Sequence, residues 1–223
     1  MRRLHSQVFF LYGVVVGLAV REALVRVGPD LVLFLSSKIQ TRHLYLEALR
    51  LIVFFLAITT FYIGSNVFFD KVHLCAEAQR NFPKSNYAYD FWFGLIHFLL
   101  FFFCAIAIND SLRSRAGLSL FLIYLAFIFL YDMIWLFANR KQDSAEEIKT
   151  WAWVCFLVCL FSGCAFLLTK HVFGGTDGIA EAVSLAVFGA YLVIDLAELM
   201  FGSPIITKWI LKHLIPRSML TGT

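Results

Sequence analysis

The hydrophobic pattern of this chain consists of long continuous apolar runs separated by short polar stretches. Each run is about twenty residues long, the length that an α-helix needs to cross the hydrocarbon core of a bilayer. Transmembrane β-strands would instead show alternating segments of about ten residues. The pattern predicts an all-α, polytopic membrane protein, a six-transmembrane-helix bundle that forms a single integral membrane domain over residues 1–223. The predicted spans cover residues 7–27, 49–69, 89–108, 118–138, 150–169 and 179–201.

The polar stretches carry local signals for turns and helix ends. Pro29 indicates that the first helix ends near Val27. The glycine-rich run after Phe173 predicts a turn, with Asp177 as the N-cap residue of the sixth helix. After the sixth span, residues 205–217 have the pattern of a short amphipathic tail that lies in the membrane interface.

Composition supports the membrane class. Hydrophobic residues make up 61% of the chain and charged residues 15%, against about 25% charged residues in soluble domains. The chain also has 25 phenylalanines, more apolar surface than a soluble core of this size can hide, so lipid is the expected partner of the outer faces. The basic residues are scattered, which gives no support to a nucleic-acid partner.

Orientation follows from the distribution of Lys and Arg over the loops. They are more frequent on the side that holds the amino terminus, the second and fourth loops and the carboxyl tail. The positive-inside rule therefore predicts both termini in the cytoplasm, in a plasma membrane or a bacterial inner membrane. Trp92, Trp135, Trp151 and Trp209 fall near the cytoplasmic boundary, where an aromatic belt is expected.

Several spans place polar residues at helical spacing on one face. The sixth span does so with Glu181, Ser184, Tyr191, Asp195 and Glu198. A charged residue at the centre of a span costs about 2.5–3.5 kcal/mol and normally faces the bundle interior. Protonatable carboxylates near a histidine are the groups of a proton relay; the alternative is that they only hold the helices together by hydrogen bonds. The predicted lining of an ion path is Asp132, Asp195, Glu198, His97, Thr59, Tyr62, Asn66 and Tyr191.

The first span carries three charges, Arg21, Glu22 and Arg26, near its predicted non-cytoplasmic end. Glu22 and Arg26 are one helical turn apart and can form an ion pair. Arg50 enters the second span from the same side. We interpret these charges as the end of a helix that projects beyond the hydrocarbon, with snorkelling arginines. The alternative is a charged vestibule at the mouth of a pore.

The sequence contains no known catalytic constellation. It lacks HExxH, Gly-x-Ser-x-Gly, CxxC and P-loop motifs. Four of the five cysteines fall inside apolar runs, which is typical of buried structural thiols and not of a disulfide framework. We therefore expect no enzyme activity, no catalytic residue, no metal and no cofactor.

Three functions remain open at the level of the sequence. The first is a channel- or transporter-like path for a small cation or a proton, formed by a homo-oligomer. The second is a non-enzymatic membrane subunit that senses the membrane or recruits a cytoplasmic protein partner, as in a bacterial defence or toxin-type system. Its partner-facing residues would be Arg140, Lys141, Glu146 and Glu147 in the charged fourth loop. The third is a substrate-binding membrane subunit of a transporter.

Overall fold

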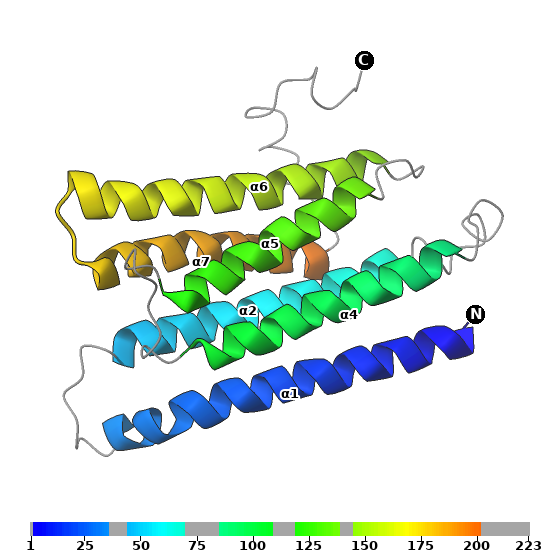
Figure 1. Ribbon diagram of the computed structural model, residues 1–223, viewed down its shortest axis with the longest axis horizontal. Helices are drawn as coiled ribbons and strands as arrows, with labels where there is room; N and C mark the ends of the chain where they lie inside the picture. Colours follow the sequence, from blue (N-terminus) through cyan, green and yellow to red (C-terminus); the bar gives the residue numbers. More distant parts are fainter. Residues whose placement is uncertain (1, 36–43, 70–84, 109–118, 139–144, 202–223) are drawn as a thin grey trace. The chain divides into compact units, whose positions relative to one another are not determined.

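The computed structural model of this protein describes residues 2–35, 44–69, 85–108, 119–138 and 145–201. In these ranges the chain forms six α-helices and one short π-helix, without strands (Figure 1). Once lipid surrounds an apolar run, its backbone N–H and C=O groups find partners only within a helix. The elements are α1 (Arg2–Leu35), α2 (Leu44–Phe69), α4 (Ser85–Ile106), α5 (Leu120–Ala138), α6 (Ala145–Leu167), η2 (Leu168–Val172) and α7 (Asp177–Phe201).

Four segments in the described part of the chain are long and apolar enough to cross a membrane, and α5 adds a shorter apolar segment. The long ones are Tyr45–Phe69, Ala88–Ile106, Trp153–Val172 and Asp177–Met200, and the shorter one is Leu120–Trp135. The predicted class, an α-helical membrane bundle, is therefore confirmed. α1 is not among these segments, and it carries Arg21, Glu22 and Arg26 close together.

α1 is longer than its apolar run. It has 34 residues, about 50 Å at 1.5 Å per residue, whereas the hydrocarbon core is about 30 Å thick. The helix continues through Pro29 to Leu35 and does not end near Val27. Proline removes the hydrogen bond to the Val25 carbonyl, but its fixed φ is compatible with a helix. A helix of this length exceeds the thickness of the hydrocarbon core, and the projection of its charged end beyond the hydrocarbon stays a prediction.

The helices form two compact units, Met1–Leu112 (unit 1) and Arg113–Thr223 (unit 2). In unit 1, α1 packs against α4 and α2. In unit 2, α6 packs against both α5 and α7. Each unit thus has its own interior between three helices, and a single domain over the whole chain stays a prediction.

The interior of unit 1 is aromatic. Tyr12 of α1 is stacked on Phe91 of α4, with ring centroids 6.1 Å apart, and lies 5.1 Å from Phe98 on the same helix. Its hydroxyl donates a hydrogen bond of 2.8 Å to the Phe91 carbonyl. Gly94, one turn before Phe98, leaves room for the Tyr12 ring. The contact of α1 with α4 therefore depends on a large residue opposite a glycine.

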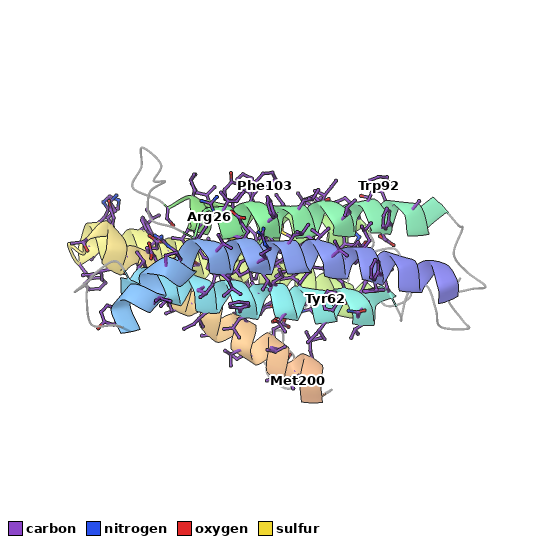
Figure 2. All side chains as sticks on the ribbon, turned by 90° about the horizontal axis from the view of Figure 1, so that it is seen from below. Arg26, Tyr62, Trp92, Phe103 and Met200 are labelled. Atoms are coloured by element: carbon purple, nitrogen blue, oxygen red, sulfur yellow. The ribbon has the colours of Figure 1, made fainter. Side chains whose placement is uncertain are left out.

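Large apolar side chains also cover the outer faces of the helices. Figure 2 shows Trp92 and Phe103 on the face of α4 that points away from α1, and both are exposed. Val193 and Met200 are exposed on α7. Such continuous apolar surface is unfavourable in water, and lipid is the environment that suits it.

A short turn joins α6 to α7. In η2 the Phe173 N–H donates to the Leu168 carbonyl, the i to i−5 pattern of a π-helix. Thr176, and not the predicted Asp177, caps α7, because its side-chain oxygen accepts the Ile179 N–H at 3.4 Å. Asp177 forms an ion pair of 2.9 Å with Lys170. The sequence offers two adjacent residues that can cap a helix, and the geometry of the turn selects the first.

Replacing Gly175 by alanine should lower the free energy of unfolding by about 1–2 kcal/mol. A β-carbon there would lie 2.9 Å from the Thr169 carbonyl oxygen. The Gly175 N–H donates to that same carbonyl, so the turn cannot widen without losing this bond. Thermal unfolding in detergent micelles measures the effect. Gly163→Ala is the control, because nothing lies within 4 Å of a β-carbon at Gly163, and equal melting temperatures for the two variants would contradict the prediction.

Candidate functional site

The polar face of α7 points into unit 2. Glu181, Ser184 and Asp195 are buried on it, whereas Ile179 and Val193 are exposed on the other side of the helix. Because these polar residues follow helical spacing, the side that the sequence marked as polar is the side that packs against α5 and α6. Of the five residues predicted for the polar face, these three are thus buried, whereas Tyr191 and Glu198 are partly exposed.

Two carboxylates from different helices meet near one end of this face. Asp132 of α5 is 7% exposed and Asp195 of α7 is 6% exposed. They lie close enough to repel each other when both are charged. Tyr191 and Glu198 lie one turn before and almost one turn after Asp195 on α7 and interact with it electrostatically.

α6 supplies two further groups to these carboxylates. The Trp151 indole Nε1–H donates to Asp195 Oδ1 at 3.1 Å. The Cys155 thiol donates to Asp132 Oδ2 at 3.6 Å, an S–H···O contact. Tyr191, one turn before Asp195 on α7, also interacts electrostatically with it. We call Asp132, Trp151, Cys155, Tyr191 and Asp195 the carboxylate cluster.

The basic side chains that the structure describes in unit 2 lie far from the carboxylate cluster along the chain. Lys170 and His171 belong to η2, beyond the carboxyl end of α6, whereas Trp151 and Cys155 lie near the amino end of that helix. The separation along α6 from Cys155 to Lys170 is about 22 Å at 1.5 Å per residue. Lys170 is moreover paired with Asp177. Among the side chains that the structure describes in unit 2, the carboxylates thus lie at one end and Lys170 at the other, while Lys149 stands two residues before Trp151 in α6 without a described side chain.

A second set of polar groups occupies the interior nearer that other end. Ser119, just before α5, donates a hydrogen bond of 2.6 Å to Glu181 Oε1 of α7. Ser162 of α6 shares a short hydroxyl–hydroxyl hydrogen bond with Ser184 of α7. All four residues are buried. We call Ser119, Ser162, Glu181 and Ser184 the serine–glutamate group.

Trp151 and Cys155 were not among the residues predicted for the site. The sequence assigned Trp151 and Trp135 to an aromatic belt at the membrane surface, but Trp135 is buried and Trp151 donates to Asp195. A signal was present, because Trp151 and Cys155 lie one helical turn apart and so share a face of α6. That face continues through Cys159 and buried Ser162.

His97 belongs to the other unit. It is buried in unit 1, with its ring 4.7 Å from that of Phe61 and 5.6 Å from that of Phe101. Its described ring neighbours are therefore aromatic side chains of α2 and α4. Because Asp132 and Asp195 belong to unit 2, a path that joins His97 to these carboxylates stays a prediction.

The polar residues predicted for α2 make local contacts. Thr59 is exposed, while its neighbour Thr60 is buried. Asn66 donates its side-chain amide to the Tyr62 carbonyl of the same helix at 2.8 Å. The Tyr62 ring lies at the edge of the aromatic interior, 6.2 Å from Phe98. The contacts described for Tyr62 and Asn66 thus lie within unit 1.

The charges predicted for the non-cytoplasmic end of the first two spans have different surroundings. Arg26 forms the expected ion pair with Glu22, with Nε 2.8 Å from Oε1, and Arg21 is exposed. Arg50 is fully buried, and its Nη1 donates a hydrogen bond of 2.9 Å to the Ile108 carbonyl after α4. It therefore connects α2 to the carboxyl end of α4, where positive charge is stabilised by the helix dipole.

The predicted partner-facing residues are mostly outside the described part of the chain. Arg140 and Lys141 lie outside it, as does the tail 205–217, and Glu146 and Glu147 are in the first turn of α6 without described side chains. Among the residues that the structure describes, no group of three or more His, Cys, Asp or Glu side chains could hold a metal ion. The recruitment of a cytoplasmic partner stays a prediction.

The chemistry of the site is thus that of buried carboxylates with hydroxyl, thiol and indole neighbours. Comparison of the chain with protein-family models, curated proteins and solved structures found no match.

Proposed function

We propose that unit 2 carries a proton, or a small monovalent cation, along its polar interior through the carboxylate cluster. The observation that carries this proposal is the pair of buried carboxylates, Asp132 and Asp195, on adjoining helices of a membrane bundle. Two like charges in an apolar interior are unfavourable, and a proton or cation bound between them removes part of that cost.

The neighbours of the carboxylates support proton exchange. Cys155 carries a proton on sulfur and contacts Asp132, and Tyr191 carries a proton on oxygen one helical turn from Asp195. Intramembrane carboxylates with such neighbours are the usual components of proton paths in pumps and transporters. The interior between three packed helices is filled with side chains, because their axes are only about 8–10 Å apart. This favours transfer along hydrogen-bonded groups over an open water-filled pore.

Asp195→Asn should reduce proton flux about tenfold or more, which corresponds to about 1.4 kcal/mol in the barrier. Asparagine keeps the size of the side chain but can neither hold the transferred proton nor attract a cation. The measurement uses the full chain in sealed liposomes with an internal pH-sensitive dye, under a pH gradient and a fixed membrane potential. Asp132→Asn should have a similar effect.

Asp177→Asn is the matched control. It makes the same chemical change at a partly exposed carboxylate that pairs with Lys170 at the other end of the unit, so we expect flux within about twofold of native. Repeating the assay at equal pH with a sodium gradient separates a cation from a proton. A native protein that passes neither, or an Asp195→Asn protein that conducts like the native one, contradicts the proposal.

A further inference from the structure

The polar interior of unit 2 is interrupted between its two sets of polar groups. On α7, Ser184 of the serine–glutamate group and Tyr191 of the carboxylate cluster are about two turns, or 10 Å, apart. Between them lies Phe188. Phe129 of α5 reaches the same level, with its ring centroid 5.0 Å from that of Phe188. The two rings therefore stand between the polar groups.

Both rings are completely enclosed. Phe129 is 0% and Phe188 2% exposed. Phe129 also makes an edge contact with Tyr191 of the carboxylate cluster, at 5.9 Å between centroids. From α6, Cys159 contributes at this level a thiol whose sulfur lies 3.9 Å from the Ala126 carbonyl. The rings thus fill the interior between α5 and α7.

Aromatic rings of this kind block the transfer of protons and hydrated ions. A proton moves between groups that are about 2.6–3.2 Å apart, or through one intervening water. Phenylalanine neither donates nor accepts in such a chain, and closely packed rings exclude water. Hydrophobic constrictions close ion paths for this reason. In the arrangement that the structure shows, the two polar groups are therefore insulated from each other.

We propose that Phe129 and Phe188 form the barrier that limits flux through unit 2, with the serine–glutamate group and the carboxylate cluster as the binding stations on its two sides. This inference rests on the proposed function, and it adds both the residues that control the flux and a second station that contains Glu181. Flux occurs when the two rings move apart and water enters between the stations.

The test is the substitution of each ring by alanine in the full chain, measured in the same liposome assay. Phe188→Ala and Phe129→Ala should each raise proton flux about tenfold. Each substitution shortens the water-free apolar segment between the two stations and so lowers the barrier to transfer. Phe127→Ala is the matched control. It removes the same side chain from the same helix, but Phe127 is 56% exposed on the outer face, so flux should not change.

A smaller change keeps the test valid if an alanine variant does not fold. Phe188→Leu removes the ring but keeps an apolar side chain, and it should raise flux by a smaller factor. Each variant is first checked for a single symmetric peak in size-exclusion chromatography. Combining Phe188→Ala with Asp195→Asn should remove the added flux, because the path then lacks the carboxylate station.

The outcomes separate this inference from the proposed function. If flux increases in the Phe188 and Phe129 variants but does not increase in Phe127→Ala, the barrier is supported. The same holds if the native protein shows no flux and only the Phe188 and Phe129 variants conduct. If native flux depends on Asp195 but the Phe188 and Phe129 variants conduct like the native protein, the barrier is overturned and the proposed function stays intact. A chain that conducts in no form overturns both. Added flux that persists in the Asp195→Asn background overturns the assignment of the cluster as a station.

Discussion

Arg50→Met should lower the free energy of unfolding by about 3 kcal/mol, since removing one partner of a buried charged interaction leaves the other uncompensated. Arg50 is 0% exposed, and its guanidinium donates to the Ile108 carbonyl at 2.9 Å. Glu47, one turn earlier on the same face of α2, is also buried. Methionine retains much of the volume of arginine but offers no donor to the Ile108 carbonyl.

The measurement is thermal or denaturant unfolding of the full chain in detergent micelles, followed by intrinsic fluorescence. Arg21→Met serves as the control, because Arg21 is exposed on α1, and we expect a change within about 0.5 kcal/mol. The stability loss of Arg50→Lys should lie between those of Arg50→Met and Arg21→Met, because lysine keeps the charge but loses the planar donor geometry of the guanidinium. An Arg50→Met protein that is as stable as the native chain would show that the bond to Ile108 contributes nothing to unit 1.

Gly94→Ala should destabilise unit 1 by about 1–3 kcal/mol through overpacking. A β-carbon at Gly94 would lie 2.8 Å from Tyr12 Cζ and would also contact the hydroxyl oxygen. The Tyr12 ring cannot easily move aside, because it is enclosed by Phe91 and Phe98 and its hydroxyl donates to the Phe91 carbonyl. The substitution therefore forces α1 and α4 apart or breaks that bond.

Gly17→Ala on α1 provides the comparison. Nothing lies within 4 Å of a β-carbon at Gly17, so alanine should be neutral or add up to about 1 kcal/mol through its higher helix propensity. A double-mutant cycle with Tyr12→Phe tests the mechanism, because removing the hydroxyl relieves part of the contact at Gly94. Costs that simply add in the double variant would rule out the Tyr12 hydroxyl as the origin of the effect.

The separation into two units bears on how the charged groups work. Buried Arg50 and His97 belong to unit 1, and buried Asp132 and Asp195 belong to unit 2. Within unit 1, the hydrogen bond of Arg50 joins α2 to the end of α4, which is a structural connection. Within unit 2, the carboxylates accept hydrogen bonds from Trp151 and Cys155 of α6, and the proposed proton exchange rests on these groups. The functional proposal therefore concerns unit 2.

The sequence by itself determined the membrane class, the succession of helices and the polar face of α7. These features depend on run length and on the 3.6-residue period, both of which are local properties of the chain. The Glu22–Arg26 pair was also predictable, because its two residues lie one turn apart on a single helix. Similarly, the buried positions of Asp132 and Asp195 follow from the cost of placing charge toward lipid.

Only the tertiary structure decided which groups from different helices meet. Trp151 was equally compatible with a membrane-surface belt, and the packing of α6 against α7 turned its indole toward Asp195. On α2 the buried residue is Thr60 and not the predicted Thr59, because tertiary packing and not the sequence of one helix decides which side is covered. The Phe129–Phe188 contact likewise depends on how α5 and α7 are aligned. The 3.6-residue period determines which residues share a face of one helix. The rotation and axial register of neighbouring helices are instead set by side-chain packing among the three helices of a unit.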